Sequence, residues 1–228
     1  MKTSNVILAI AAVGTLVMGC ERKPKLDTDL QKASYAIGQQ IGQNLKNQNI
    51  DFDKDTLAAS IIEAASGKEP RLKPEEMQAA LMKLQEGINK KQMEVAETNA
   101  AEGKAFLEKN KSAQGVQTTS SGLQYQIVEE GKGKKPTEKD TVKVHYKGTL
   151  VGGQQFDSSY DRGQPAEFPV NAVIKGWSEA LQLMKTGTKA KLFIPPELAY
   201  GPTPRPGIPA NSVLVFDVEL IDVVSAKK

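Results

Sequence analysis

Cysteine and histidine are almost absent from this chain of 228 residues, which contains one of each. A disulfide within the chain is therefore impossible, and a zinc site made of cysteine and histidine would need several more ligands. A catalytic triad could use only His145, and a Cys-His pair would have to join that residue to Cys20. These absences exclude most nucleophilic chemistry and a zinc site of cysteine and histidine, and we expect neither a metal ion nor another cofactor.

An excess of one charge is also lacking. The chain has 30 basic and 27 acidic residues, a net charge of +3, and the basic residues are spread along its length. Nucleic acids are bound by concentrated basic patches, so we expect no nucleic-acid partner. With 39% hydrophobic and 25% charged residues, the composition is typical of a soluble globular protein and too polar for a protein with many membrane spans.

The one long hydrophobic run lies at the N-terminus, where Lys2 precedes an apolar stretch from Val6 to Val17. A short charged start followed by an apolar middle is the layout of a secretory signal. The stretch is shorter than the ~20 residues that a membrane-spanning helix needs. We therefore expect residues 1–19 to be a signal peptide.

The end of that run, Val17-Met18-Gly19-Cys20, resembles a bacterial lipobox. The resemblance implies a lipoprotein signal peptide whose cleavage leaves Cys20 as the first residue, acylated on its sulfur and its amine. Several acyl chains suffice for stable membrane anchoring. Glu21, in place of aspartate, favours export to the outer membrane. A plain cleaved signal and a structural or reactive cysteine are the alternatives.

Aromatic residues and prolines are scarce before residue 113, where only three of the 12 residues of each kind lie. No proline occurs between Glu75 and Lys135. The two halves of the chain thus follow different local rules, which predicts two domains with a boundary near residue 112. We expect a helical domain over residues 20–112 and a second domain over residues 113–228.

The first half shows helical periodicity. Asp27 and Asp53 stand where the caps of two helices are expected, and Pro74 suits the first turn of a third helix that runs to about Lys109. The apolar stripe of this third helix fades beyond Val95. Because a helix without an apolar face has nothing to pack, we expect that stretch to be a solvated stalk.

A polar segment, residues 110–121, is expected to be the hinge into the second domain. The helical unit over residues 26–72 is smaller than a chain that easily forms its own core. A second copy would supply the missing burial, so we expect a homodimer through this half. A monomeric spacer is the alternative.

The second half alternates apolar and polar residues with a period of two, which is typical of strands. One window, Trp177–Met184, instead places apolar residues on one helical face. A single short helix beside an antiparallel sheet makes an α+β domain. The expected strands cover residues 123–128, 142–146, 190–194 and 213–220.

Six motifs of this half resemble those of FK506-binding-protein (FKBP) type prolyl isomerases and occur in the same order, over about 100 residues. With the lipobox and the helical first half, the chain resembles the macrophage infectivity potentiator and FkpA group of bacterial envelope proteins. The motifs are VHYKG at 144–148, FDSS at 156–159 with Arg162-Gly163 after it, Val173-Ile174-x-Gly176-Trp177, Ala199-Tyr200-Gly201, Gly207-Ile208-Pro209, and LVFDVEL at 214–220.

The resemblance implies a helical dimerisation domain with a long connecting helix, then an antiparallel β-sheet wrapped on one short helix. It also implies a proline pocket with Trp177 as its floor. Asp157, paired with Arg162 or Tyr146, and Tyr200, as a hydrogen-bond donor, are the implied catalytic residues. The implied substrate-binding residues are Tyr146, Phe156, Arg162, Phe168, Val173, Ile174, Trp177, Ile208 and Phe216. Core packing is the alternative role of the aromatic residues.

Two residues near these motifs need a separate interpretation. Ala166 stands where many family members carry an aromatic residue, so one wall of the pocket should be lower and the affinity for inhibitors is open. His145 alternates with Tyr146 along a strand and should face away from the pocket, in a structural role.

Isomerisation of an X-Pro bond fits a chain so poor in histidine and cysteine, because rotation about the amide needs no nucleophile and no general base. We expect an envelope isomerase that acts on proline-containing unfolded or partly folded proteins, has chaperone activity, and can bind ligands of the FK506 and rapamycin type. It would be lipid-anchored at the outer membrane and face the periplasm or the cell surface. The alternatives are a chaperone that only holds its clients and a surface adhesin.

Overall fold

The computed structural model of the chain describes residues 24–47 and 50–224. Cys20, the lipobox and the signal sequence lie outside the described residues. Within the described ranges, no helix combines the length and the apolar character that crossing a membrane requires.

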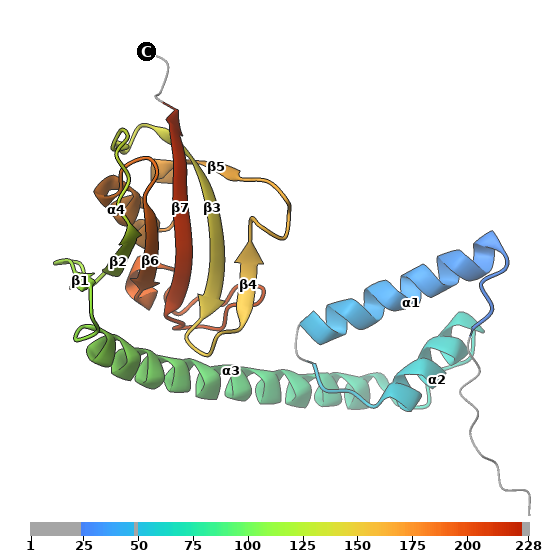
Figure 1. Cartoon of the computed structure of the whole chain (residues 1–228). Helices are drawn as coiled ribbons and strands as arrows, with labels where there is room; N and C mark the ends of the chain where they lie inside the picture. Colours follow the sequence, from blue (N-terminus) through green and yellow to red (C-terminus); the bar gives the residue numbers. More distant parts are fainter. Residues whose placement is uncertain (1–23, 48–49, 225–228) are drawn as a thin grey trace, which may run out of the picture. The chain divides into compact units, whose positions relative to one another are not determined.

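Three helices come first: α1 (Asp29–Asn47), α2 (Lys54–Ala65) and α3 (Pro74–Asn110) (Figure 1). The prediction of Asp27 as the first cap is wrong, because Thr28 holds that place. The amide of Gln31 donates to Thr28 Oγ1 over 3.2 Å, while Gln31 Oε1 accepts from the Thr28 amide over 3.1 Å. This reciprocal pair is a capping box, and Asp27 stands one residue before it.

The other two helix starts agree with the sequence. Asp53 Oδ1 accepts from the Thr56 amide over 2.7 Å and caps α2. Pro74 is the first residue of α3, where its missing amide hydrogen costs nothing. The 37 residues of α3 make it the longest helix of the described chain.

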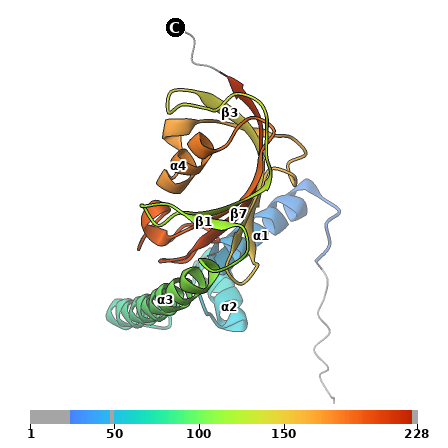
Figure 2. The same ribbon diagram turned by 60° about the vertical axis from the view of Figure 1, so that its left-hand side comes forward.

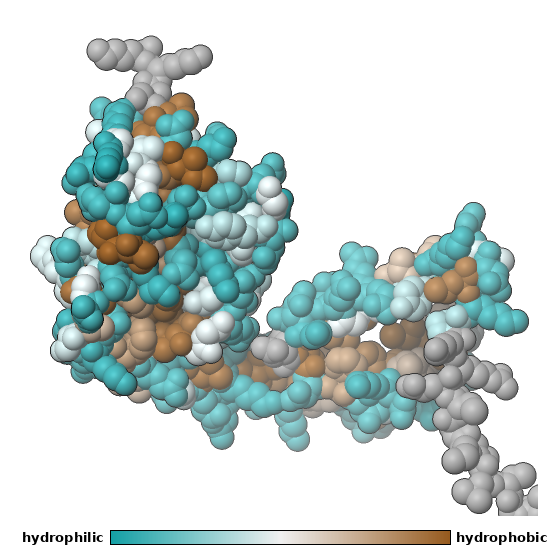
Figure 3. Space-filling model, viewed as in Figure 1, coloured by the Kyte–Doolittle hydropathy of each residue, from teal (hydrophilic) through white to brown (hydrophobic). Residues whose placement is uncertain are grey.

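Helices α1 and α3 carry apolar side chains at the surface. None of the residues of α1 is buried, and Leu30 and Ile37 are 78% and 60% exposed. On the N-terminal part of α3, Leu81 and Met82 are exposed as well. Figure 3 shows apolar residues along one side of α3. Exposed apolar stripes of this kind are characteristic of helices that pack against a partner.

The prediction that α3 is a solvated stalk beyond Val95 is corrected for one face of the helix, although most residues of that stretch are exposed. Gly103 is buried, and a Cβ on it would lie 2.7 Å from Val213 Cγ2 of the second domain. The rings of Phe106 and Phe193 pack with centroids 5.9 Å apart. The contact face is made largely of small and polar residues, so a search for apolar side chains alone does not find it.

The polar segment before the sheet is only partly a hinge. Strand β1 (Val116–Thr118) lies within it and pairs antiparallel with β2 (Gln124–Glu129), with Val116 opposite Gln126. Gln126 Nε2 also donates to the carbonyl of Gln114 over 3.0 Å. The expectation of a hinge over the whole of residues 110–121 is therefore corrected, because backbone pairing ties much of the segment to the sheet.

Seven antiparallel strands form one sheet in the order β1-β2-β6-β7-β3-β4, and β5 pairs with β3 beyond the end of β4. The sequence predicts four of them. It misses β1, β4 and β5, which have only three or four residues each. The strands not yet given bounds are β3 (Thr141–Leu150), β4 (Gln155–Ser158), β5 (Ala166–Pro169), β6 (Lys189–Ile194) and β7 (Leu214–Val224).

Figure 2 shows the sheet curving around α4 (Lys175–Leu183). The core lies between the sheet and α4. Alternate residues of β3 and β7 point to α4, and Trp177, Ala180 and Leu181 of α4 pack in the same core. The predicted α+β class and the single short helix are confirmed. The inward residues of the two central strands are Val142, Val144 and Tyr146 on β3 and Leu214, Phe216, Val218 and Leu220 on β7.

Candidate active site

An aromatic cluster lies where α4 meets the concave face of the sheet. Trp177 is at its centre and is only 4% exposed. Its ring centroid lies 5.3 Å from Tyr146 of β3, 5.2 Å from Phe216 of β7 and 5.9 Å from Phe168 of β5, at interplanar angles of 81° to 88°. Edge-to-face packing of this kind leaves a rigid apolar surface around the indole.

Gly148 makes room for part of this cluster. A Cβ on it would lie 2.6 Å from the Phe156 ring and 2.8 Å from the Phe216 ring. These two rings pack edge-to-face with centroids 5.5 Å apart. The glycine that ends the VHYKG motif is therefore needed because any side chain there would push the two rings out of place.

The polar edge of the cluster joins three side chains. Tyr146 donates its hydroxyl hydrogen to Asp157 Oδ2, and the guanidinium of Arg162 donates to Asp157 Oδ1 over 2.5 Å. Arg162 also donates to the Tyr146 hydroxyl over 2.8 Å and lies 5.5 Å from the centroid of its ring. Asp157 thus has both of the partners that the sequence offered as alternatives.

These contacts shift the pKa values of Asp157 and Tyr146 in opposite directions. Burial would raise the pKa of Asp157, but hydrogen bonds from Tyr146 and Arg162 outweigh it and hold that pKa below its usual value. Burial, and then the hydrogen bond to Asp157, raises the pKa of Tyr146. At neutral pH the aspartate is an anion and the tyrosine a neutral donor, so neither is suited to exchange protons with a substrate.

A pocket of about 370 Å³ opens beside this edge, lined by Phe156, Asp157, Tyr200, Arg205, Pro206 and Ile208. Arg205 and Ile208 close the tip of their loop with two mutual backbone hydrogen bonds of 2.8 and 2.9 Å. The guanidinium of Arg205 lies 5.6 Å from the Tyr200 ring centroid. The sequence analysis predicts Ile208 as a substrate-binding residue but does not identify Arg205 and Pro206 as lining residues.

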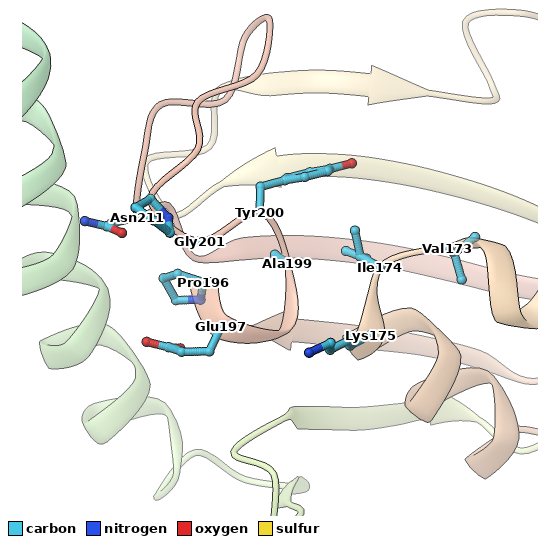
Figure 4. Close-up of a pocket in the computed structure, with 10 residues that line it drawn as sticks. Val173, Ile174, Lys175, Pro196, Glu197, Ala199, Tyr200, Gly201 and Asn211 are labelled. Carbon is cyan, nitrogen blue, oxygen red and sulfur yellow. The ribbon is translucent and has the colours of Figure 1, made fainter.

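A second cavity, of about 470 Å³, lies on the other side of Tyr200. Figure 4 shows the Tyr200 ring extending from its loop toward Ile174 and Val173, with Lys175 and Glu197 below. Neither Lys175 nor Glu197 has an ion-pair partner within the part of the chain that the structure describes. Tyr200 lines both cavities and is the one residue that they share.

The structure brings the sequence-predicted residues of the second domain to one region, on five different elements and three connecting segments. His145 is not among them: its Nδ1 lies 3.0 Å from Ser159 Oγ, and its ring stacks on Tyr160 at 4.5 Å. Among the described residues, no group of three or more histidines, cysteines, aspartates or glutamates could hold a metal ion. The roles of the assembled residues in binding and catalysis stay predictions.

One polar atom of the site has no partner. The indole Nε1 of Trp177 is buried and makes no hydrogen bond within the described chain. An unsatisfied buried donor costs ~1–3 kcal/mol, which a protein tolerates where a rigid shape is needed for another reason. Here the large flat indole provides the floor of the cluster.

Comparison with known proteins matches both halves of the chain. A model described as FKBP-type peptidyl-prolyl cis-trans isomerase covers residues 132–221, and one described as the domain amino terminal to FKBP-type peptidyl-prolyl isomerase covers residues 30–127. FkpA of Escherichia coli K12 is 44% identical in an alignment of 219 residues that covers 91% of this chain and 81% of the relative. Outer membrane protein MIP of Legionella longbeachae is 43% identical over 99% of this chain and 100% of its own.

A solved structure agrees with these matches. The crystal structure of FkpA from Escherichia coli superposes with a TM-score of 0.64 at 44% identity and covers 89% of this chain and 100% of its own. The predicted family and the predicted fold, a helical N-terminal region followed by an antiparallel sheet with a helix, are therefore confirmed. Identity at this level over nearly the whole chain, together with the two matching models, establishes that the chain belongs to the FKBP-type peptidyl-prolyl cis-trans isomerases.

Proposed function

We propose that this isomerase interconverts the two forms of X-Pro bonds at the aromatic cluster around Trp177 and the cavity beside it, which is lined by Phe156, Asp157 and Tyr200, without a nucleophile or a general base. The observation that carries the proposal is the set of edge-to-face rings bordered by one ionised aspartate. A proline ring is apolar and rigid, so it fits such a surface, while the flanking amide stays near the polar edge.

The chemical problem is a rotational barrier. Twisting an X-Pro amide breaks its resonance and costs ~18–20 kcal/mol, although the cis and trans forms differ little in energy. A catalyst must hold the ring, remove water from the amide and favour the twisted geometry over the planar one. An apolar pocket with few polar groups satisfies these requirements.

Each residue then has a distinct role. The Trp177 indole lies under the prolyl ring, with Tyr146, Phe156, Val173, Ile174, Phe168 and Phe216 around it and Ile208 at the rim. The charge of Asp157, held by Arg162, faces the carbonyl carbon as the amide twists, and Tyr200 donates a hydrogen bond to a substrate carbonyl.

The second cavity fits the chain next to the proline. An extended residue advances the backbone by ~3.3 Å, so two or three residues reach from the proline pocket past Tyr200. Lys175 and Glu197, both without an ion-pair partner in the described chain, give this cavity one charge of each sign. We infer that protein substrates and FK506-like or rapamycin-like ligands both use the two cavities that share Tyr200.

Removal of single polar groups tests the site. We expect Asp157→Asn and Tyr200→Phe each to lower kcat/KM for an X-Pro peptide by about tenfold, the loss of one hydrogen bond or charge that is specific to the transition state. In a proline-limited refolding assay, both variants should lose acceleration and still suppress aggregation. Tyr125→Phe is the control, because it removes a tyrosine hydroxyl that lies outside both cavities and bonds to Gln117; it should keep the activity of the parent. Unchanged isomerisation in both test variants would show that the site is assigned wrongly.

We also propose that the protein is a homodimer with chaperone activity. The exposed apolar residues on α1 and on the N-terminal part of α3 support this, because a second copy would cover them. The match of residues 30–127 to the domain found amino terminal to such isomerases supports it as well.

The cell envelope is the proposed location, with a lipid on Cys20 as the anchor in the outer membrane. The lipobox supports this, and one relative is named an outer membrane protein. We expect Cys20→Ser to move the protein from the membrane fraction to the soluble fraction and to abolish labelling by radioactive palmitate. A variant at the neighbouring residue, Glu21→Gln, should keep the label. Retained labelling of the Cys20→Ser variant would contradict the anchor.

A further inference from the structure

Asn211 has an unusual backbone for its residue type. Its φ of +57° makes it the only non-glycine residue of the described chain with a positive φ. Asparagine tolerates this left-handed conformation better than most residues, because its short amide can bond locally. Asn211 lies on the loop between Ile208 of the pocket and the central strand β7, so its conformation sets the path of the chain between them.

The contacts of Asn211 link that loop to two other places. Its amide donates to the carbonyl of Gly201 over 2.8 Å, next to Tyr200. Its side-chain Nδ2 donates to the carbonyl of Ala96 on α3 over 3.3 Å. Figure 4 shows the side-chain amide group of Asn211 pointing to α3 and away from Tyr200. Asn211 therefore connects α3 to the arm of the loop that carries Tyr200.

Asn99, about one turn after Ala96 along α3, reaches the other arm. Its Nδ2 donates to the carbonyl of Ala210 over 3.0 Å and lies 3.4 Å from Ser212 Oγ. Ser212 in turn donates to the carbonyl of Pro209 over 2.7 Å. Pro209 follows Ile208 directly, so this second chain of bonds runs from α3 to the rim of the proline pocket.

The face of α3 that makes these contacts has a helical spacing. Ala96, Asn99, Gly103, Phe106 and Asn110 follow one another at intervals of three and four residues, which places them on one side of the helix. Gly103 allows the close approach to Val213, and Asn110 Nδ2 donates to Gln124 Oε1 over 2.8 Å. The two asparagines thus belong to a continuous docking face and are not isolated contacts.

The loop itself has little else to hold it. Residues 202–207 are all exposed, and the closed tip bonds mainly to itself. Exposed loops with few buried contacts populate several conformations. If a substrate binds only one of these conformations, its apparent Kd equals the intrinsic Kd divided by the fraction of molecules in that conformation. A less populated conformation therefore gives weaker binding.

We propose that Asn99 and Asn211 are positioning residues of the isomerase site, and that they make α3 part of its substrate-binding structure. They fix the two arms of the loop so that Tyr200 and Ile208 face the substrate together. The inference rests on the proposed role of Tyr200 and Ile208 in binding. It means that the helical half of the protein affects the pocket through direct contacts with its loop.

Two substitutions in the full-length protein test the proposal. Asn99→Asp keeps the shape of the side chain, but its carboxylate cannot donate to the carbonyl of Ala210. Asn211→Gly allows the same left-handed backbone but removes the side-chain amide that donates to Ala96. We expect each to raise KM for an X-Pro peptide by about three- to tenfold and to leave kcat within about twofold, because the population of the competent loop falls. Asn99→Gln, which keeps an amide donor, should recover part of the loss.

The controls separate positioning from folding. Asn89→Asp makes the same charge change on α3, at an exposed residue whose side chain bonds to Gln85 of its own helix, and should leave KM unchanged. All assays are run well below the melting temperature of each variant, where a purely structural role would leave KM unaltered. KM values within about 1.5-fold of the parent in both test variants would overturn the proposal. If Tyr200→Phe then also has no effect on activity, the proposed site itself is wrong. If Tyr200→Phe lowers activity, the site stands and only the positioning role of the two asparagines is refuted.

Discussion

Trp177→Ala should lower kcat/KM for X-Pro isomerisation by at least about 100-fold. The variant loses the flat floor of the pocket, and the three rings that pack edge-to-face around it lose their common partner. Water would enter the space and solvate the amide, which removes the desolvation that favours the twisted form. Exchange NMR on an X-Pro peptide measures the cis-trans interconversion directly and needs no coupled protease.

Stability must be followed in the same experiment, because truncating a buried tryptophan to alanine costs ~3–5 kcal/mol. Trp177→Phe is the matched control: it keeps an aromatic floor, removes the unpaired indole N–H and should lose less than about tenfold. Circular dichroism shows whether the alanine variant is folded, since the chain has no other tryptophan to report on it. A folded alanine variant with activity within about threefold of the parent would place the reaction outside this pocket.

The paired substitution Ile37→Glu and Ile41→Glu should convert the proposed dimer to monomers and raise its dissociation constant by more than about a thousandfold. Both isoleucines are exposed along α1 in the single chain, 60% and 40%, so burial of the charges would occur only in the dimer. Each interface would bury four carboxylates, and a buried unpaired charge costs several kcal/mol. Sedimentation equilibrium measures the change in mass.

A control with equal charge is available on the same helix. Gln39→Glu with Gln43→Glu changes two other exposed residues of α1, about half a turn away from Ile37 and Ile41, and should stay dimeric. The monomeric variant should keep its activity on short peptides, because the pocket is complete within one chain, and lose most of its suppression of aggregation. A parent protein that sediments as a monomer, or a variant with both isoleucines replaced that stays dimeric, would refute the proposed interface.

The sequence predicts most of the fold because the relevant signals are local. The period of two in Val142, Val144 and Tyr146 and the helical face of α4 each follow from neighbouring residues. The helix starts at Asp53 and Pro74 are equally local. The first cap is missed by one residue, because Asp27 and Thr28 are both good caps and only the reach of Gln31 decides between them.

The docking of α3 could not be found in the same way. Its contact face consists largely of alanine, asparagine and glycine, which pack through close backbone approach and side-chain hydrogen bonds. A pattern search for apolar residues therefore predicts that this stretch is exposed to solvent. The spacing of three and four residues between the contact residues can be recognised only after their contacts with the second domain are known. Short strands such as β4 and β5 are missed for a related reason, because four residues are too few to establish a period.

The sequence by itself determined the class of fold, the family and the kind of chemistry, because ordered motifs and the lack of histidine and cysteine are properties of the chain alone. Only the tertiary structure decided how Asp157 is held, since Tyr146 and Arg162 both reach it and neither contact follows from spacing. It also decided that α3 meets the loop of Tyr200 and Ile208. That contact joins residues more than a hundred positions apart, and long-range contacts depend on how whole elements pack.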